Sequence, residues 1–84
     1  MKKVNFTKHA YEKFAFLKRY GFEVDENVVR QAVGHPVHLD RRGDHVLALR
    51  PIDEQHAIRV VYEEVNDNIV AVTFYPVKRE RFNV

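Results

Sequence analysis

Residues 57–75, AIRVVYEEVNDNIVAVTFY, carry the strongest fold signal in the chain. β-Branched and aromatic residues dominate both halves of this stretch, which predicts two strands, Ala57–Val65 and Ile69–Tyr75. Between them lies the segment 66–68, Asn-Asp-Asn, whose residue types tolerate the left-handed backbone of tight turns. We therefore predict an antiparallel hairpin with a three-residue loop.

This loop also determines which side chains share a face of the hairpin. With Asp67 at its centre, Arg59 lies opposite Tyr75, and Val61 lies opposite Thr73. The other face is more apolar: Val60, Tyr62, Val72 and Phe74. We expect the helices to pack on this second face and a more polar set of side chains to remain on the first.

Further strands are predicted upstream of the hairpin. Val37–Asp40 and His45–Arg50 flank a turn at residues 41–44, and Pro51 ends the second of them. Met1–Asn5 is a candidate for a short edge strand. Together these segments predict an antiparallel sheet of three to four strands.

The first helix is predicted at Lys8–Tyr20. Thr7 suits the N-cap position, because its hydroxyl can accept a hydrogen bond from a free amide of the first turn. An apolar stripe follows at helical spacing: Ala10, Phe14 and Leu17. Gly21 then supplies the left-handed residue that commonly ends a helix.

A second, shorter helix is predicted from Asp25 to Gly34, with Asp25 as its cap. Its buried face is formed by three residues: Val29, Ala32 and Val33. His35-Pro36 marks its end, because the residue before a proline avoids the helical conformation. Residues 1–84 are thus predicted to form one α+β domain with two N-terminal helices packed on the sheet.

Composition limits the classes of protein to which the chain can belong. It has 84 residues, enough for one domain, and no cysteine. Disulfides, thiolate metal sites and a cysteine nucleophile are therefore excluded. No apolar stretch has the length of a signal peptide or a membrane span, so we expect a cytoplasmic protein without a membrane partner.

Positive charge gathers at the two ends of the sequence, although the net charge is only +2. Six cations lie within the first twenty residues: Lys2, Lys3, Lys8, Lys13, Lys18 and Arg19. Three more lie within the last seven: Lys78, Arg79 and Arg81. If the two ends meet in space, they form a basic patch suited to phosphate or to an acidic partner.

Several of these residues also match a known pattern. The segment 7–10, Thr-Lys-His-Ala, is followed by Lys13, by the segment 19–22, Arg-Tyr-Gly-Phe, and by Val29 and Pro36. The chain ends with 72–76, Val-Thr-Phe-Tyr-Pro, and then Lys78, Arg79, Arg81 and Phe82. Over nearly its whole length the chain resembles a family of small uncharacterised proteins with the RelE/ParE-like toxin fold.

The resemblance implies the toxin component of a toxin–antitoxin pair, with an antitoxin protein as partner and RNA or the ribosome as target. It also implies cleavage of mRNA without a metal or other cofactor, which requires a base, an acid and cations around the phosphate. We predict four catalytic residues: His9, Lys13, Arg59 and Tyr75. Four cations are predicted to contact the nucleic-acid backbone: Arg19, Lys78, Arg79 and Arg81.

Each catalytic candidate has a role suited to its chemistry. His9 is the predicted base, because the positive end of the helix dipole favours a neutral imidazole in the first turn. Lys13 lies one turn later on the same face and can hold a phosphate. Arg59 would clamp negative charge, and Tyr75 would donate a proton or stack on a base.

Other interpretations stay open at this stage. His9 can equally hydrogen-bond within the fold, and Lys13 stands where arginine is more common in the family, which favours a non-catalytic binding module. The chain could also be a toxin that acts on a protein target such as gyrase, or a structural homodimer. Three histidines lie close together in sequence, at positions 35, 38 and 45, but no carboxylate completes a ligand set, so no metal site is predicted.

Overall fold

The computed structural model describes residues 3–84 and forms a five-stranded sheet with two α-helices. The chain begins with β1 (Val4–Phe6), α1 (Lys8–Arg19) and α2 (Glu26–Gly34). Four strands follow: β2 (His38–Arg42), β3 (His45–Pro51), β4 (His56–Val65) and β5 (Asn68–Lys78). A single 3₁₀ turn, η1 (Arg79–Arg81), comes last. The predicted α+β class and the two helices near the N-terminus are confirmed.

The sheet differs from the prediction in its strand number and in the direction of one strand. Its order is β1-β5-β4-β3-β2; neighbours from β2 to β5 are antiparallel, but β1 pairs with β5 in parallel. The prediction of an antiparallel sheet of three to four strands is therefore wrong. A three-residue strand is too short to show an alternating pattern, and its partner lies at the far end of the sequence. Of the predicted edge strand Met1–Asn5, residues 1 and 2 lie outside the described part of the chain.

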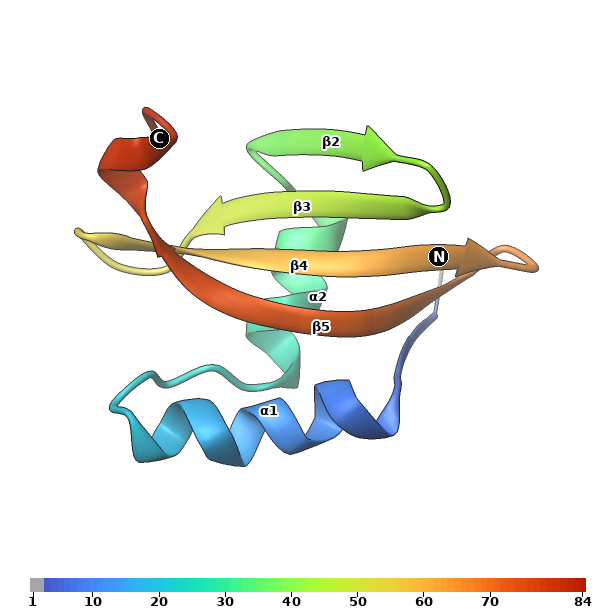
Figure 1. Cartoon of the computed structure of the whole chain (residues 1–84), viewed down its shortest axis with the longest axis horizontal. Coiled ribbons are helices and arrows are strands. Elements are labelled where there is room, and N and C mark those ends of the chain that lie inside the picture. The colour runs from blue at the N-terminus through green and yellow to red at the C-terminus, as the bar shows by residue number, and fades with distance from the viewer. Residues whose placement is uncertain (1–2) are drawn as a thin grey trace.

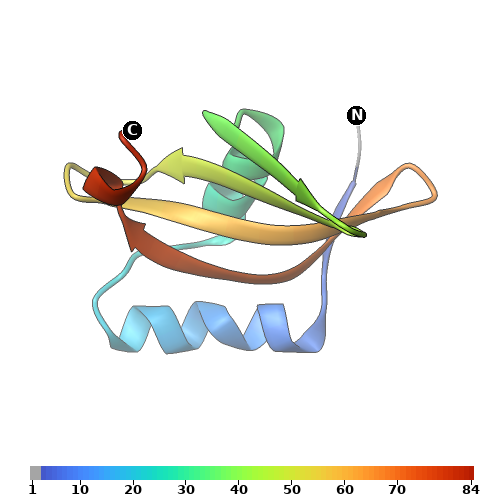
Figure 2. The same cartoon turned by 45° about the horizontal axis from the view of Figure 1, so that its top comes forward.

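Both helices cover the same face of the sheet. In Figure 1 the uncovered face is turned toward the viewer, α2 lies behind β3 and β4, and α1 runs alongside β5. The turned view of Figure 2 shows the same two-layer arrangement. We call the uncovered side the open face. The C-terminal segment that contains η1 lies over one end of it, where Phe82 contacts Arg59.

The core lies between the helices and one face of the strands. Its largest fully buried side chain is Phe74 of β5, which is 0% exposed and packs against Phe14 of α1 at 4.8 Å between ring centroids. Val60 of β4 and Val29 of α2 are equally buried in the same cluster. The predicted division of the hairpin into a helix-bearing face and a polar face is thus confirmed for Val60 and Phe74.

The β4–β5 hairpin has the predicted register at Arg59, but its turn differs from the prediction. Arg59 pairs with Tyr75 as predicted, but Val65 pairs with Asn68, so the turn has two residues instead of three. A β-bulge next to Val61 inserts one extra residue into β5 and restores the register beyond it. The bulge also places Ala71 opposite Tyr62, and Ala71, instead of the predicted Val72, is buried on the helix-bearing face.

Local turn chemistry explains the remaining shifts in strand ends. The β2–β3 turn is reduced to Gly43-Asp44, because Gly43 adopts a φ of +61° at the first central position and lets Arg42 pair with His45. β5 continues through Pro76, although proline has no amide to donate. Beyond Ala71, β1 no longer pairs with β5, so this part of β5 is an edge, where a proline is tolerated.

The helix caps are those that the sequence predicts. The Thr7 hydroxyl accepts a hydrogen bond from the amide of Ala10 at 3.1 Å and donates one to the carbonyl of Val72 at 3.1 Å. The Asp25 carboxylate accepts from the amide of Val28 at 2.9 Å. Thr7 therefore caps α1 and also ties the helix to β5.

Replacement of Thr7 by alanine should destabilise the fold by about 1–2 kcal/mol, because it removes both the helix cap and the link to Val72. Thr7→Ser is the matched control, since it keeps the hydroxyl, and should cost much less. Urea unfolding followed by circular dichroism measures both. Equal stability of the two variants would show that the hydroxyl has no such role.

None of the helices in residues 3–84 is long and apolar enough to cross a membrane.

Candidate functional site

Arg59 of β4 and Tyr75 of β5 are neighbours on the open face, toward the end that the C-terminal segment covers. Arg59 stands between Ile58 and Val60, which are buried under the helices, so strand alternation directs its side chain to the opposite side. Tyr75 is its cross-strand partner and follows the buried Phe74. The two predicted residues are thus neighbours on one face of the sheet, as the hairpin register requires.

The guanidinium of Arg59 is held by two further contacts. Its Cζ atom lies 5.2 Å from the ring centroid of Phe82, which comes from the segment after η1. Its Nη2 atom lies 3.9 Å from Oδ2 of Asp40, but that oxygen has a shorter contact, 2.9 Å, with Nε of Arg42. The Arg59 side chain is only 17% exposed. It is therefore a partly desolvated cation that packs on the ring of Phe82, with Tyr75 as its cross-strand neighbour.

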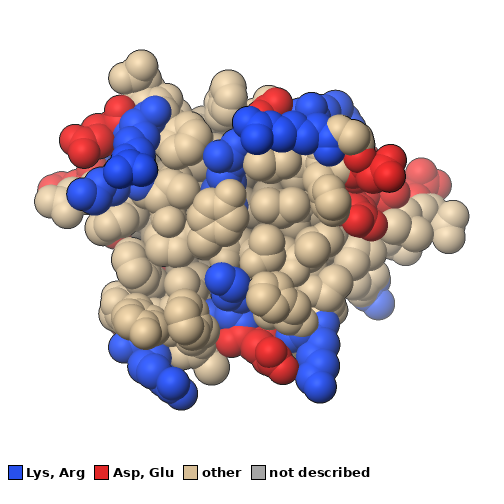
Figure 3. Space-filling view, viewed as in Figure 1, with Lys and Arg blue, Asp and Glu red and all other residues tan. Residues whose placement is uncertain are grey.

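The middle of the open face is largely uncharged. Figure 3, in the view of Figure 1, shows few charged atoms over the middle of the sheet, and groups of Lys and Arg together with Asp and Glu near its margins. Strand register places Leu47, Val61 and Thr73 on this face with Arg59 and Tyr75. An aromatic and apolar platform with cations at its rim suits single-stranded nucleic acid, which stacks its bases and leaves its phosphates to the cations.

Arg79, predicted to contact a nucleic-acid backbone, instead joins parts of the protein. Its Nε donates to the carbonyl of Val84 at 3.0 Å, and its Nη1 donates to the carbonyl of Asp53 at 2.9 Å. Its amide donates to the carbonyl of Gln55 at 2.9 Å. These bonds fasten η1 to the β3–β4 loop. Lys78 and Arg81, by contrast, are exposed beside it.

The other predicted cations and the predicted base belong to α1. His9 is exposed in the first turn, and it lines a surface hollow with Glu12, Lys13 and Phe16. The ammonium of Lys13 lies 5.4 Å from the ring centroid of Phe16. Arg19 is exposed at the other end of the helix.

The structure does not bring His9 to the C-terminal cations. The first turn of α1 and the η1 turn lie at opposite ends of the molecule in both views (Figures 1 and 2). Within residues 3–84, His9 and the first turn of α1 therefore share no basic patch with the C-terminal cations. The predicted catalytic residues thus form two separate pairs, Arg59 with Tyr75 on the open face and His9 with Lys13 on α1.

The closely spaced histidines do not form a ligand set. His38 and His45 lie at opposite ends of the β2–β3 ladder, since His38 pairs with Leu49 and His45 pairs with Arg42. Nε2 of His45 lies 3.0 Å from Oε1 of Glu63. Within residues 3–84, no three His, Asp or Glu side chains are grouped so that they could hold a metal ion.

Sequence reasoning missed a histidine–carboxylate pair at the start of β4. Oδ1 of Asp53 lies 3.2 Å from Nδ1 of His56. The same oxygen accepts hydrogen bonds from the amide of Gln55, at 2.8 Å, and from the amide of His56, at 2.6 Å. The ring of Phe22 meets the imidazole edge-on at 5.1 Å. The signal in the sequence was an aspartate three residues before a histidine just after Pro51, a spacing at which an aspartate caps a turn.

Asp53 should make the stability of the fold depend on pH. The hydrogen bond from the Gln55 amide is the main cause that lowers the pKa of this carboxyl below its ordinary value of 3.8, with help from His56. Because the pKa of Asp53 is lower in the folded state than in the unfolded state, the carboxylate stabilises the fold at pH values above its unfolded-state pKa. This stabilisation is lost as the pH falls through the folded-state pKa.

Asp53→Asn should therefore lower the urea midpoint at pH 7 and change it much less at about pH 2, where the wild-type carboxylate is protonated as well. Asp44→Asn, in the exposed β2–β3 turn, is the matched control for loss of one carboxylate. If Asp53→Asn lowered the urea midpoint equally at both pH values, the Asp53 carboxylate would not be the source of the pH dependence.

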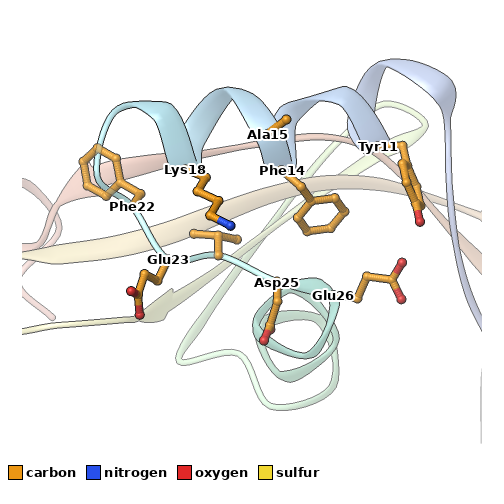
Figure 4. A pocket seen from close by; sticks show the side chains of 9 residues that line it. Tyr11, Phe14, Ala15, Lys18, Phe22, Glu23, Asp25 and Glu26 are labelled. Carbon is orange, nitrogen blue, oxygen red and sulfur yellow. The ribbon is translucent and has the colours of Figure 1, made fainter.

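A groove of about 570 Å³ lies between the two helices. In Figure 4, Tyr11, Phe14 and Lys18 project from α1 toward the segment that leads into α2. Phe22 and Val24 add to the apolar lining, and three carboxylates stand along it: Glu23, Asp25 and Glu26. The groove thus combines an apolar floor with a mainly acidic rim.

Comparison with models of protein families, with curated proteins and with solved structures finds no match to this chain.

Proposed function

We propose that this protein is a RelE-like toxin that binds mRNA on the open face of its sheet and cleaves it without a metal ion. The pairing of Arg59 with Tyr75 on that face, beneath Phe82, is the observation that carries the proposal. It supplies a fixed cation and two aromatic rings in one place, the combination that a single-stranded RNA requires.

Arg59 suits the phosphate because its planar guanidinium can donate two parallel hydrogen bonds to phosphate oxygens. Its partial burial strengthens that attraction, because fewer water molecules screen the charge. Tyr75 can stack on a base or donate a proton from its hydroxyl. Lys78 at the end of β5 and Arg81 at the end of η1, both exposed, would hold neighbouring phosphates.

The antitoxin is proposed to occupy the groove between α1 and α2. Its apolar floor calls for large apolar side chains, and its acidic rim calls for lysines or arginines beside them. The fitting partner is therefore a basic amphipathic segment. The groove is on the helix-bearing side, so such a segment would leave the open face accessible unless it also wraps around the sheet.

The direct test incubates the purified protein with free mRNA and with ribosome-bound mRNA, each with and without EDTA. We expect cleavage that persists in EDTA, detected by primer extension, and RNA binding detected by fluorescence anisotropy. Intact RNA under every condition would overturn the nuclease assignment.

A non-catalytic RNA-binding module is the second candidate, favoured by the separation of His9 from the C-terminal cations (Figure 1). It predicts RNA binding without cleavage. Growth arrest on expression with neither binding nor cleavage would instead indicate a protein target such as gyrase. Light scattering of the same sample reports whether the chain forms a homodimer.

A further inference from the structure

We propose that His56, oriented by Asp53, is a proton-transfer residue for cleavage of an RNA phosphodiester, and that Lys78 holds the reacting phosphate. This inference rests on the proposed nuclease function; it adds His56 and Asp53, which the sequence pattern did not indicate, and gives Lys78 a specific role. It begins from the contact between Nδ1 of His56 and Oδ1 of Asp53, 3.2 Å long, at the start of β4.

The carboxylate of Asp53 selects the useful form of the imidazole. An acceptor beside Nδ1 favours the tautomer that carries its proton there, which leaves Nε2 with a free lone pair. A histidine oriented in this way by a third group is the usual arrangement of a general base. Two main-chain amides also bind Asp53, so the carboxylate itself is held in place.

The surroundings restrict the imidazole ring further. Phe22 packs edge-on against the ring with 5.1 Å between centroids. Arg79 bonds the carbonyls of Asp53 and Gln55 on the other side, so the β3–β4 loop is tied to η1. The His56 side chain remains 28% exposed. The pair is thus both fixed and reachable from solvent.

Lys78 supplies the cation. It pairs with His56 in the β4–β5 register, and the two residues line one cavity of about 340 Å³. The other residues of that cavity are Glu54, Gln55, Arg79 and Glu80. Among its charged groups, Arg79 is bonded to main-chain carbonyls, and the exposed Lys78 is the cation that remains for a phosphate.

The proposed step balances without any further reactant. Nε2 of His56 removes the proton of a ribose 2′-hydroxyl, and the resulting oxygen attacks the adjacent phosphorus. The bond from phosphorus to the 5′-oxygen breaks, that oxygen takes a proton from water, and the imidazolium returns its proton to solvent. The products are a 2′,3′-cyclic phosphate and a 5′-hydroxyl.

His56 and Arg59 are three residues apart on β4, so strand alternation directs Arg59 to the open face and His56 to the helix-bearing side, where Phe22 contacts it. In this scheme one RNA chain reaches both residues. Three residues of a strand span about 10 Å. The start of β4, the end of β5 and η1 meet at one end of the sheet (Figure 1), where a flexible RNA strand can pass from the open face to the cavity. Arg59 then acts in binding and charge stabilisation, and His56 acts on the proton.

The test compares cleavage by the wild type, His56→Gln and Lys78→Gln, with His35→Gln, at the exposed C-cap of α2, as the matched histidine control. We expect about a 100-fold lower kcat for His56→Gln, with a smaller change in KM and loss of the acid limb of the pH–rate profile. Lys78→Gln should mainly raise KM. His35→Gln should leave both values unchanged.

A second readout does not depend on turnover. Uridine 3′-monophosphate is titrated into the wild-type protein, and the imidazole signals are followed by NMR, with the charged neighbours Asp53, Glu54, Lys78, Arg79 and Glu80 kept intact. A saturable shift of the His56 signal, absent in Lys78→Gln, supports the site. No shift of that signal overturns it.

Failure of the inference and failure of the proposed function look different. If wild-type protein cleaves RNA and folded His56→Gln cleaves it equally fast, only the role of His56 is overturned. If the wild type neither binds nor cleaves RNA, the proposed function is overturned and the role of His56 with it.

Discussion

Replacement of Arg59 by alanine is expected to reduce RNA cleavage by about 10²–10³-fold, the usual cost of removing one group that stabilises charge in a transition state. The guanidinium is partly buried against Phe82, so no neighbouring solvent-exposed cation can replace it at the same point. Single-turnover cleavage of ribosome-bound mRNA measures the effect.

Two further variants show whether the effect has the proposed cause. Arg59→Lys keeps the charge but loses the planar fork, so its rate should lie between those of the wild type and Arg59→Ala. Arg30→Ala removes an arginine that is exposed on α2 and paired with Glu26, and should change the rate little. Arg59→Ala protein that is folded, as shown by its thermal unfolding, and cleaves at the wild-type rate would contradict the site.

Replacement of Phe74 by alanine is expected to lower the free energy of unfolding by about 3–5 kcal/mol. The ring is 0% exposed and lies where α1 packs on β5, so its removal leaves a cavity that the surrounding strands cannot fill. In a domain of this size, each kcal/mol lowers Tm by about 4–8 °C. The variant should therefore be largely unfolded near 37 °C, as measured by calorimetry and urea titration.

Phe16→Ala is the matched control for this substitution. Phe16 lies on the outer side of α1, is 49% exposed and contacts Tyr20 and the ammonium of Lys13. Its loss should cost about 1 kcal/mol or less, since little apolar surface is returned to water. Equal destabilisation by the two phenylalanine variants would place the core elsewhere than between α1 and β5.

The helices could be predicted closely because their signals are local. Thr7 and Asp25 cap the two helices with side chains that bond amides three residues later. Gly21 has a φ of +86°, which explains why α1 ends just before it. Each of these signals depends only on residues within one turn of the chain, so tertiary packing did not have to be known.

The hairpin shows how a correct register can follow from an incomplete argument. A three-residue loop and a two-residue turn with a bulge place Arg59 opposite Tyr75 equally well. Asn66 and Asp67 both adopt positive φ, at 50° and 65°, which makes the two-residue turn possible. The residue types near Val72 do not predict the bulge. The bulge lies next to the point where the pairing of β5 with β1 ends, so it depends on contacts with two other strands.

For this protein, the sequence by itself determined the α+β class, the two capped helices, the central hairpin and the pairing of Arg59 with Tyr75. Tertiary structure alone decided that β1 runs parallel to β5, that Arg79 fastens η1 to the β3–β4 loop, and that His9 and the C-terminal cations lie at opposite ends. The physical reason is the range of the interactions. Caps, turns and alternation act between near neighbours, whereas strand direction and the gathering of distant side chains depend on how the whole chain closes around its core.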